Sequence, residues 1–101
     1  MSATVFEKNG TVLTVKPEGR LDTAAVTELD AELKQLDGVQ DIIFDFSNVN
    51  YITSIGLRML LGLAQRAEEK KGSLRLIHVG ETIIEVFEMV GFMELMQVER
   101  D

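Results

Sequence analysis

The sequence predicts an α/β fold, a small mixed and mostly parallel sheet packed by amphipathic helices. Three observations lead to this class. The 101 residues suit a single domain with one core, so we expect residues 1–101 to fold as one unit. Short β-like segments alternate with longer helix-like ones, as in layered α/β proteins. The wholly apolar segment Ile42–Phe44 is typical of a central parallel strand covered on both faces.

The first two predicted strands, Thr4–Lys8 and Thr11–Lys16, form an antiparallel hairpin. Between them lies Asn9-Gly10, a dipeptide that favours the positive φ angles of a two-residue turn. Pro17 ends the second strand, because its nitrogen has no hydrogen to donate. Gly19 permits a bend into the next element.

A first helix is predicted to begin where Asp22 or Thr23 caps the unpaired N–H groups of its first turn. Gly38 is expected to be its C-terminal cap, because glycine readily adopts the left-handed conformation that ends many helices. Apolar residues recur at steps of three and four, so one stripe faces the core. The stripe consists of Val26, Leu29, Leu33 and Leu36.

A second helix is predicted to begin near Ser54 and to end at Gly72. One of its sides is apolar and the other polar, which is the pattern of a helix that lies on a core. Lys70 and Lys71 in its last turn suit the negative end of the helix dipole. Its apolar side consists of Leu57, Leu60, Leu61, Ala64 and Ala67.

The last quarter of the chain is predicted to contain a strand, Leu74–Val79, and a third helix that ends before Gly91. A final short strand or turn is expected around Leu95–Val98. The core stripe of the third helix consists of Ile83, Val86, Phe87 and Val90. The methionines are interpreted as core and rim residues, although such side chains can also form an adaptable binding surface. They are Met59, Met89, Met93 and Met96.

No catalytic, cofactor or metal site can be assembled from the sequence, so we do not expect an enzyme. The single histidine, His78, has no nucleophile beside it and is interpreted as a core or surface filler. The chain lacks the Gly-x-Ser-x-Gly elbow, the P-loop lysine, the dinucleotide-binding glycines and the HExxH pair. It has no cysteine, which excludes thiolate ligands and is compatible with a reducing cytoplasm.

The formal net charge of −7 argues against direct binding to nucleic acid, which depends on basic residues that displace counterions from phosphates. Acidity can steer the protein toward a basic protein surface, or can simply keep it soluble. The N-terminus has no signal-peptide pattern, and no apolar run approaches the roughly 18 residues that span a bilayer. We therefore expect a soluble cytoplasmic protein without membrane insertion.

The most informative segment is Asp45–Leu57, with the sequence DFSNVNYITSIGL. It joins the central strand to the second helix through a turn with two hydroxyl side chains, Thr53 and Ser54, just before Gly56. A hydroxyl at the start of a helix is usually a cap, because its oxygen accepts a hydrogen bond from a free backbone N–H group. Residue chemistry alone therefore favours a capping role.

The order of residues in this segment resembles the signature of STAS domains, and most closely that of the bacterial anti-sigma factor antagonists. The resemblance covers nearly the whole chain and implies that Ser54 is a phosphorylation site, with Thr53 as the second candidate. The family usually has Asp before this serine and a small or hydroxylated residue after it, where this chain has Thr53 and Ile55. The resemblance implies a partner-binding surface of Asp22, Thr53, Ser54, Ile55, Gly56, Leu57 and Arg58.

The implied partner is an anti-sigma factor that is also a serine protein kinase. The unphosphorylated protein would bind it and so release a sigma factor, and a serine/threonine phosphatase would reverse the phosphorylation. ATP would belong to the partner, so no cofactor is expected here. A second hypothesis is a non-phosphorylated STAS accessory subunit of a membrane transport complex.

A phosphate on Ser54 adds about −1.5 to −2 charge, which the start of a helix tolerates because its dipole and free N–H groups favour anions. The fold should therefore survive the modification. A partner packed on the same helix start would have to bury that charge unpaired, which is costly. We therefore expect a binding switch without a conformational switch.

Overall fold

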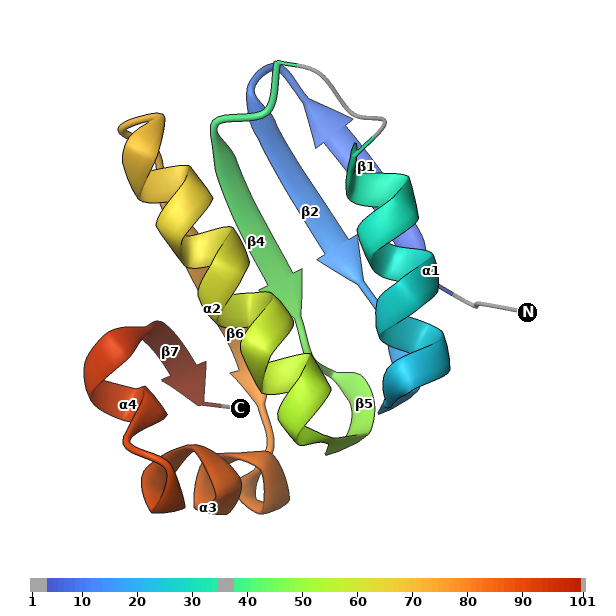
Figure 1. Ribbon diagram of the computed structural model, residues 1–101, viewed down its shortest axis with the longest axis vertical. Coiled ribbons are helices and arrows are strands. Elements are labelled where there is room, and N and C mark those ends of the chain that lie inside the picture. Colours follow the sequence, from blue (N-terminus) through green and yellow to red (C-terminus); the bar gives the residue numbers. More distant parts are fainter. Residues whose placement is uncertain (1–3, 35–37, 101) are drawn as a thin grey trace.

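The computed structural model describes residues 4–34 and 38–100. It confirms the α/β class. The described part contains seven strands and four helices, in an order that alternates the two along most of the chain (Figure 1). In chain order they are β1 (Val5–Asn9), β2 (Val12–Lys16), β3 (Glu18–Leu21), α1 (Thr23–Lys34), β4 (Asp41–Asp45), β5 (Asn48–Ile52), α2 (Ser54–Glu69), β6 (Leu74–Val79), α3 (Glu81–Met89), α4 (Phe92–Leu95) and β7 (Gln97–Arg100).

The main sheet has five strands in the order β1-β2-β4-β6-β7. The hairpin prediction is confirmed, because β1 pairs antiparallel with β2 and Gly10 in the turn has a φ of +64°. The pairs β2–β4, β4–β6 and β6–β7 are all parallel. The sheet is therefore mixed and mostly parallel, with the predicted central strand in its middle.

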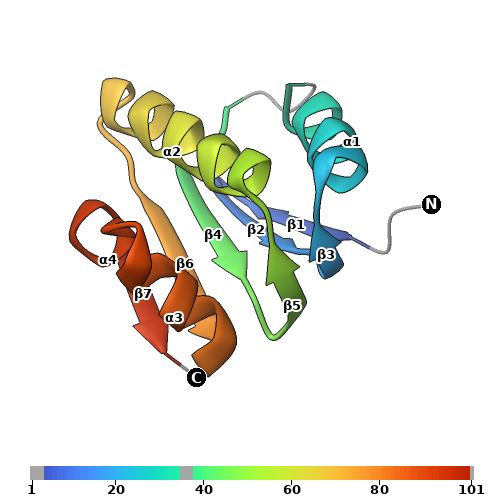
Figure 2. The same cartoon turned by 60° about the horizontal axis from the view of Figure 1, so that its bottom comes forward.

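Helices α1 and α2 lie side by side over one face of this sheet (Figures 1 and 2). The burial of β4 follows from this arrangement. Phe44 faces the core and is fully buried, whereas Ile42 and Ile43 are only half-buried. The prediction of a strand covered on both faces is therefore wrong in this detail: successive side chains alternate between faces, and the face that Ile43 shares is less covered.

The core joins this face of the sheet to all four helices. A series of aromatic rings connects β4 to the C-terminal helices: the centroids of Phe44 and Phe46 lie 6.3 Å apart, those of Phe46 and Phe87 6.1 Å, and those of Phe87 and Phe92 5.3 Å. Tilted and edge-on ring pairs at such distances add to the stabilisation that burial provides. The C-terminal helices are thereby tied to the middle of the sheet.

A second sheet of two parallel strands, β3 and β5, was not predicted. Gly19 does not form a bend between elements; it lies within β3 with a φ of +85°, next to a register shift between Gly19 and Arg20. Such an irregularity is a common use of glycine in a strand. Residues 48–52, expected to be a turn, form β5.

Three predictions about the first helix have different outcomes. Asp22 is its cap, since its Oδ1 atom accepts a hydrogen bond of 3.1 Å from the N–H of Ala25. Leu36 lies outside the described residues, so the fourth position of the stripe stays a prediction. Gly38 has a φ of +75°, as a helix cap would, but the residues between it and Lys34 are not described.

The third helix ends one residue earlier than its apolar stripe suggested. Val90 follows the last residue of α3 and is 51% exposed, and Ile84 is buried in its place. Met89 is 85% exposed, so its interpretation as a core or rim residue is wrong. The final strand, β7, begins at Gln97, two residues later than expected.

Asp45, the acidic residue that closes the central strand, shapes the turn into β5. Its Oδ1 atom accepts hydrogen bonds from the backbone N–H of Ser47 at 2.9 Å and from the Ser47 hydroxyl at 2.7 Å. Burial by itself would raise the pKa of Asp45. The two hydrogen bonds from Ser47 favour the ionised form, and together with His78 and Lys16 they hold the pKa below its usual value of 3.8.

We expect Ser47→Ala to raise the pKa of Asp45 toward its ordinary value, because one of the two hydrogen bonds is lost. The pKa is lower in the folded than in the unfolded chain, so Asp45 contributes stability that is fully present above the ordinary pKa of 3.8. That contribution disappears as the pH falls through the folded pKa. An NMR titration of the Asp45 carboxyl carbon checks the shift, and equal pKa values in the variant and wild type would contradict it.

Candidate functional site

The candidate site lies where α1 and α2 begin. Each helix directly follows one strand of the two-stranded sheet, and β3 and β5 are parallel, with Leu21 opposite Ile52. The two helix starts, Asp22 and Thr53, are therefore held at the same edge. Both ends carry free N–H groups and the positive end of a helix dipole, so this edge favours negative charge.

Thr53 is the cap of α2. Its Oγ1 atom donates a hydrogen bond of 2.8 Å to the carbonyl oxygen of Leu21 and accepts one of 3.3 Å from the N–H of Gly56. Its own N–H donates to the same Leu21 carbonyl at 3.1 Å. The half-buried hydroxyl thus connects α2 to the end of β3, and the capping interpretation is confirmed for Thr53.

Ser54 is the first residue of α2 and is exposed. Within the part of the chain that the structure describes, its hydroxyl makes no hydrogen bond. Ser54 therefore lies at the solvent-facing start of a helix, as predicted. Of the two adjacent hydroxyls, the Thr53 oxygen holds the helix to β3, whereas Ser54 is exposed to solvent.

Of residues 55–58, two pack against the interior and two face outward. Gly56 is buried: a Cβ atom there would lie 2.8 Å from Cγ1 of Ile52 and 3.0 Å from the Leu21 carbonyl oxygen, so only glycine lets α2 approach the two-stranded sheet this closely. Leu57 is half-buried against the core. Ile55, which is 38% exposed, and Arg58 face outward.

A contact beside the site, between Arg20 and Tyr51, was not predicted from the sequence. The guanidinium of Arg20 in β3 lies 4.6 Å from the ring centre of Tyr51 in β5, a cation–π contact. Nε of Arg20 is 4.0 Å from Oδ2 of Asp22. The two residues are far apart in the chain, and only the unpredicted pairing of β3 with β5 brings them together.

Other kinds of site find little support in the described residues. No three of their His, Asp or Glu side chains come together in a way that could hold a metal ion. His78 lies exposed near the end of β6, with an unusual φ of +55°. None of the described helices is both long and apolar enough to cross a membrane.

The two hydroxyls should respond differently to mutation. We expect Thr53→Ala to lower the free energy of unfolding by roughly 0.5–2 kcal/mol, because α2 loses its cap and the Leu21 carbonyl loses a donor. Ser54→Ala should change it by less than about 0.5 kcal/mol, the usual range for surface substitutions. Urea denaturation of both variants checks this. Equal effects would mean that the hydroxyls share the capping role.

The comparisons with known proteins agree with this architecture. Residues 3–101 match the family model of the STAS domain. An anti-sigma-B factor antagonist of Staphylococcus aureus is 34% identical over 86 residues, which cover 83% of this chain and 80% of that protein.

Two solved structures of the anti-sigma factor antagonist SpoIIAA share the fold. The unphosphorylated form has a TM-score of 0.79 and 22% identity, and the match covers 98% of this chain and 88% of that one. The phosphorylated form, from Bacillus, has a TM-score of 0.76 and 24% identity over 95% of this chain and 90% of that one. The chain therefore belongs to the STAS domain family, among relatives that are named anti-sigma factor antagonists.

Proposed function

We propose that this protein is an anti-sigma factor antagonist that Ser54 phosphorylation switches off. Its unphosphorylated form binds an anti-sigma factor that is also a serine kinase, and a sigma factor is released. A serine/threonine phosphatase resets the switch, and the cycle takes place in the cytoplasm. One observation carries the proposal: Ser54 presents an unengaged hydroxyl to solvent at a helix start, while the neighbouring Thr53 hydroxyl is held in the fold.

The surface around Ser54 is suited to a partner protein. Ile55 supplies an exposed apolar contact and Arg58 a cation one turn into α2. A groove of about 230 Å³ between α1 and α2 continues from these two residues along the helix pair. Asp22, at the start of α1, adds a carboxylate at the same edge. Ser54 thus lies at one end of a continuous surface with apolar and charged groups.

Phosphorylation at Ser54 would change binding more than folding. Ser54 is the first residue of α2, where the helix dipole favours an anion. A bound partner, however, would have to cover roughly two added negative charges at the edge that also carries the carboxylate of Asp22. Covering such a charge is strongly unfavourable unless the partner's own surface supplies cations to pair it.

The test uses an anti-sigma factor with serine kinase activity from the same organism. With ATP, it should add one phosphate at Ser54, located by mass spectrometry. Ser54→Ala should block the modification and still bind the partner. Ser54→Asp should weaken binding by at least about tenfold, or roughly 1.4 kcal/mol, in isothermal titration calorimetry.

A matched control tests whether the effect depends on where the negative charge is added and not only on its amount. Gln65→Glu makes the same change in charge on an exposed site of α2, about three turns from Ser54, and should leave the affinity within roughly twofold. Thermal melts of every variant exclude unfolding as the cause. A phosphate found on Thr53 would move the site by one residue. If Ser54→Asp binds as tightly as wild type and no phosphate is added, the switch is refuted and the accessory-subunit hypothesis takes its place.

A further inference from the structure

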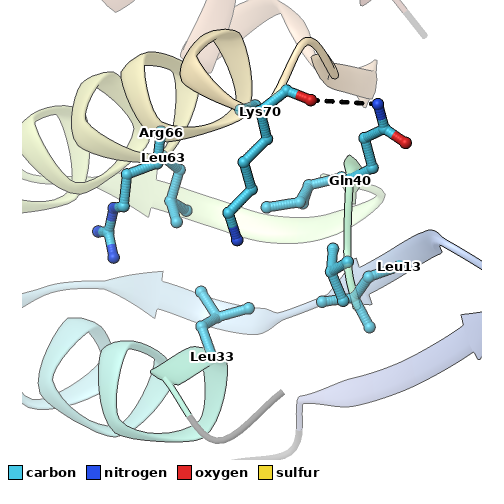
Figure 3. Close-up of a pocket in the computed structure, with 9 residues that line it drawn as sticks. Leu13, Leu33, Gln40, Leu63, Arg66 and Lys70 are labelled. Atoms are coloured by element: carbon cyan, nitrogen blue, oxygen red, sulfur yellow. Dashed lines mark hydrogen bonds between the residues drawn. The ribbon is translucent and has the colours of Figure 1, made fainter. Parts of the chain in front are cut away.

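A second cavity lies at the opposite end of the helix pair from Ser54. It opens where the C-terminal turns of α1 and α2 pass over the start of β4 (Figure 3). Its volume is about 70 Å³. The residues that line it are Leu13, Leu33, Val39, Gln40, Ile42, Leu63, Arg66, Ala67 and Lys70. None of them belongs to the surface proposed for the partner except Arg66, which borders both hollows.

The inside of the cavity is apolar. Leu13 of β2 forms part of it and is itself fully buried, and Leu63 and Ala67 of α2 are nearly so. Leu33 reaches in from α1 and Ile42 from β4, and both are only half-buried. These two side chains keep apolar surface that a ligand could still remove from water. Such removal is the main source of affinity for an aliphatic group.

The rim carries two cations. Figure 3 shows the Lys70 side chain extending from α2 toward Leu33 of α1. Lys70 forms no ion pair with the residues that the structure describes. Arg66 has only a long contact of 3.9 Å with Asp30, a carboxylate that lies closer to Lys34, at 3.4 Å. Although the formal net charge of the protein is −7, an anion at this rim would meet two positively charged side chains.

The end of a helix normally repels anions, because its last carbonyl oxygens are unpaired. Here Gln40 offsets this effect. Its Nε2 atom donates to the carbonyl oxygens of Lys70 at 3.1 Å and Lys71 at 3.4 Å. The N–H of Gly72 donates to the Ala67 carbonyl at 2.7 Å. Several of the last carbonyls of α2 are thus occupied, and the two cations dominate the rim.

We propose that this cavity binds a short-chain aliphatic carboxylate, with its tail among Leu13, Leu33 and Leu63 and its carboxylate beside Lys70 and Arg66. The size follows from the volume. A cavity of about 150 Å³ binds benzene, which has six carbons, so about 70 Å³ accommodates a tail of about three to four carbons. The ligand is therefore close to butyrate or pentanoate.

The test is a homologous series measured by two-dimensional NMR of the folded protein. Sodium propionate, butyrate, pentanoate, hexanoate and octanoate are titrated, and shifts are followed at the amides of Leu33, Leu63 and Ala67. The dissociation constant should fall about threefold to fourfold for each added methylene, as expected for burial of such a group. The gain should stop near five carbons, when the cavity is full. Pentanol and pentylamine should bind at least about tenfold more weakly than pentanoate.

Neighbouring lysines provide a matched pair of variants. Lys70→Gln removes the cation at the rim and should weaken pentanoate binding at least about fivefold. Lys71→Gln removes the same charge from the next residue, which is exposed and does not line the cavity, and should leave the affinity within about twofold. Ser54→Asp should also leave it unchanged, so this proposal and the proposed switch succeed or fail separately.

Three outcomes would overturn the proposal. The first is the absence of saturable shifts at these amides up to about 50 mM pentanoate, a limit that includes weak specific binding. The second is equal binding of pentanol, which would show that Lys70 merely covers the apolar surface with its own chain. The third is an equal loss in the Lys70 and Lys71 variants, which would show unspecific attraction to the basic end of the helix.

Discussion

Replacing Phe44 by alanine should lower the free energy of unfolding by about 3–5 kcal/mol, the usual cost of deleting a buried aromatic side chain. Phe44 has no exposed surface, lies in the middle strand of the sheet and packs its ring 6.3 Å from that of Phe46. Its removal leaves a cavity at the β4 end of the aromatic series. Domains of this size are stable by only about 5–15 kcal/mol, so the change in the urea midpoint should be large.

The control is Ile43→Ala in the same strand. Ile43 is half-buried and points to the opposite face of the sheet, so its truncation exposes less new apolar surface and leaves no closed cavity. It should cost clearly less than Phe44→Ala. If the two variants unfold at the same urea concentration, the helix-covered face is not the main core.

Gly72→Ala should be the most damaging of the glycine substitutions, at about 3 kcal/mol or more. A Cβ atom at Gly72 would lie 1.9 Å from the carbonyl oxygen of Gln40, well inside van der Waals contact, and this oxygen belongs to the backbone. It cannot turn away as a side chain would. The next residue, Ser73, accepts a hydrogen bond of 2.8 Å from the N–H of Ile42, so a shift of the chain would also disturb the start of β4.

Gly62→Ala makes the same chemical change at a position where the added methyl group has room. Gly62 lies within α2, and a Cβ atom there would meet only the end of Arg66, at 3.9 Å. Alanine is the better helix former, so this variant should be more stable than wild type by about 0.5–1 kcal/mol. Thermal unfolding of the pair checks both signs. If Gly72→Ala melts as wild type does, the close approach of these two segments is not rigid.

The elements with strong and local signals were predictable from the sequence. The Asn9-Gly10 hairpin, the central strand and the long amphipathic α2 all follow from patterns within about a dozen residues. β3 is four residues long and contains Gly19, and β5 is short and contains two asparagines, which are uncommon in strands, so neither gives a clear strand signal. Val90 was misplaced because a periodic stripe does not reveal the turn at which a helix stops.

The position of the candidate site was predictable from the sequence. Which of its two hydroxyls caps the helix was not. Thr53 is held by a carbonyl 32 residues earlier in the chain, at Leu21, and no local pattern encodes that contact. The contact between Arg20 and Tyr51 depends on the same strand pairing. Local chemistry predicts that a hydroxyl caps the helix, whereas only the tertiary fold decides which one.

The two-stranded sheet of β3 and β5 is the part of the fold in which we expect local opening at the lowest free energy. Two paired strands are barely stable without support, and the register shift after Gly19 weakens this pair further. Regions of this kind open and close with a free energy well below that of global unfolding. Both helix starts are attached to these strands, while the aromatic series packs between β4 and the C-terminal helices. We therefore expect the backbone amides around Ser54 to exchange with solvent faster than those of β4.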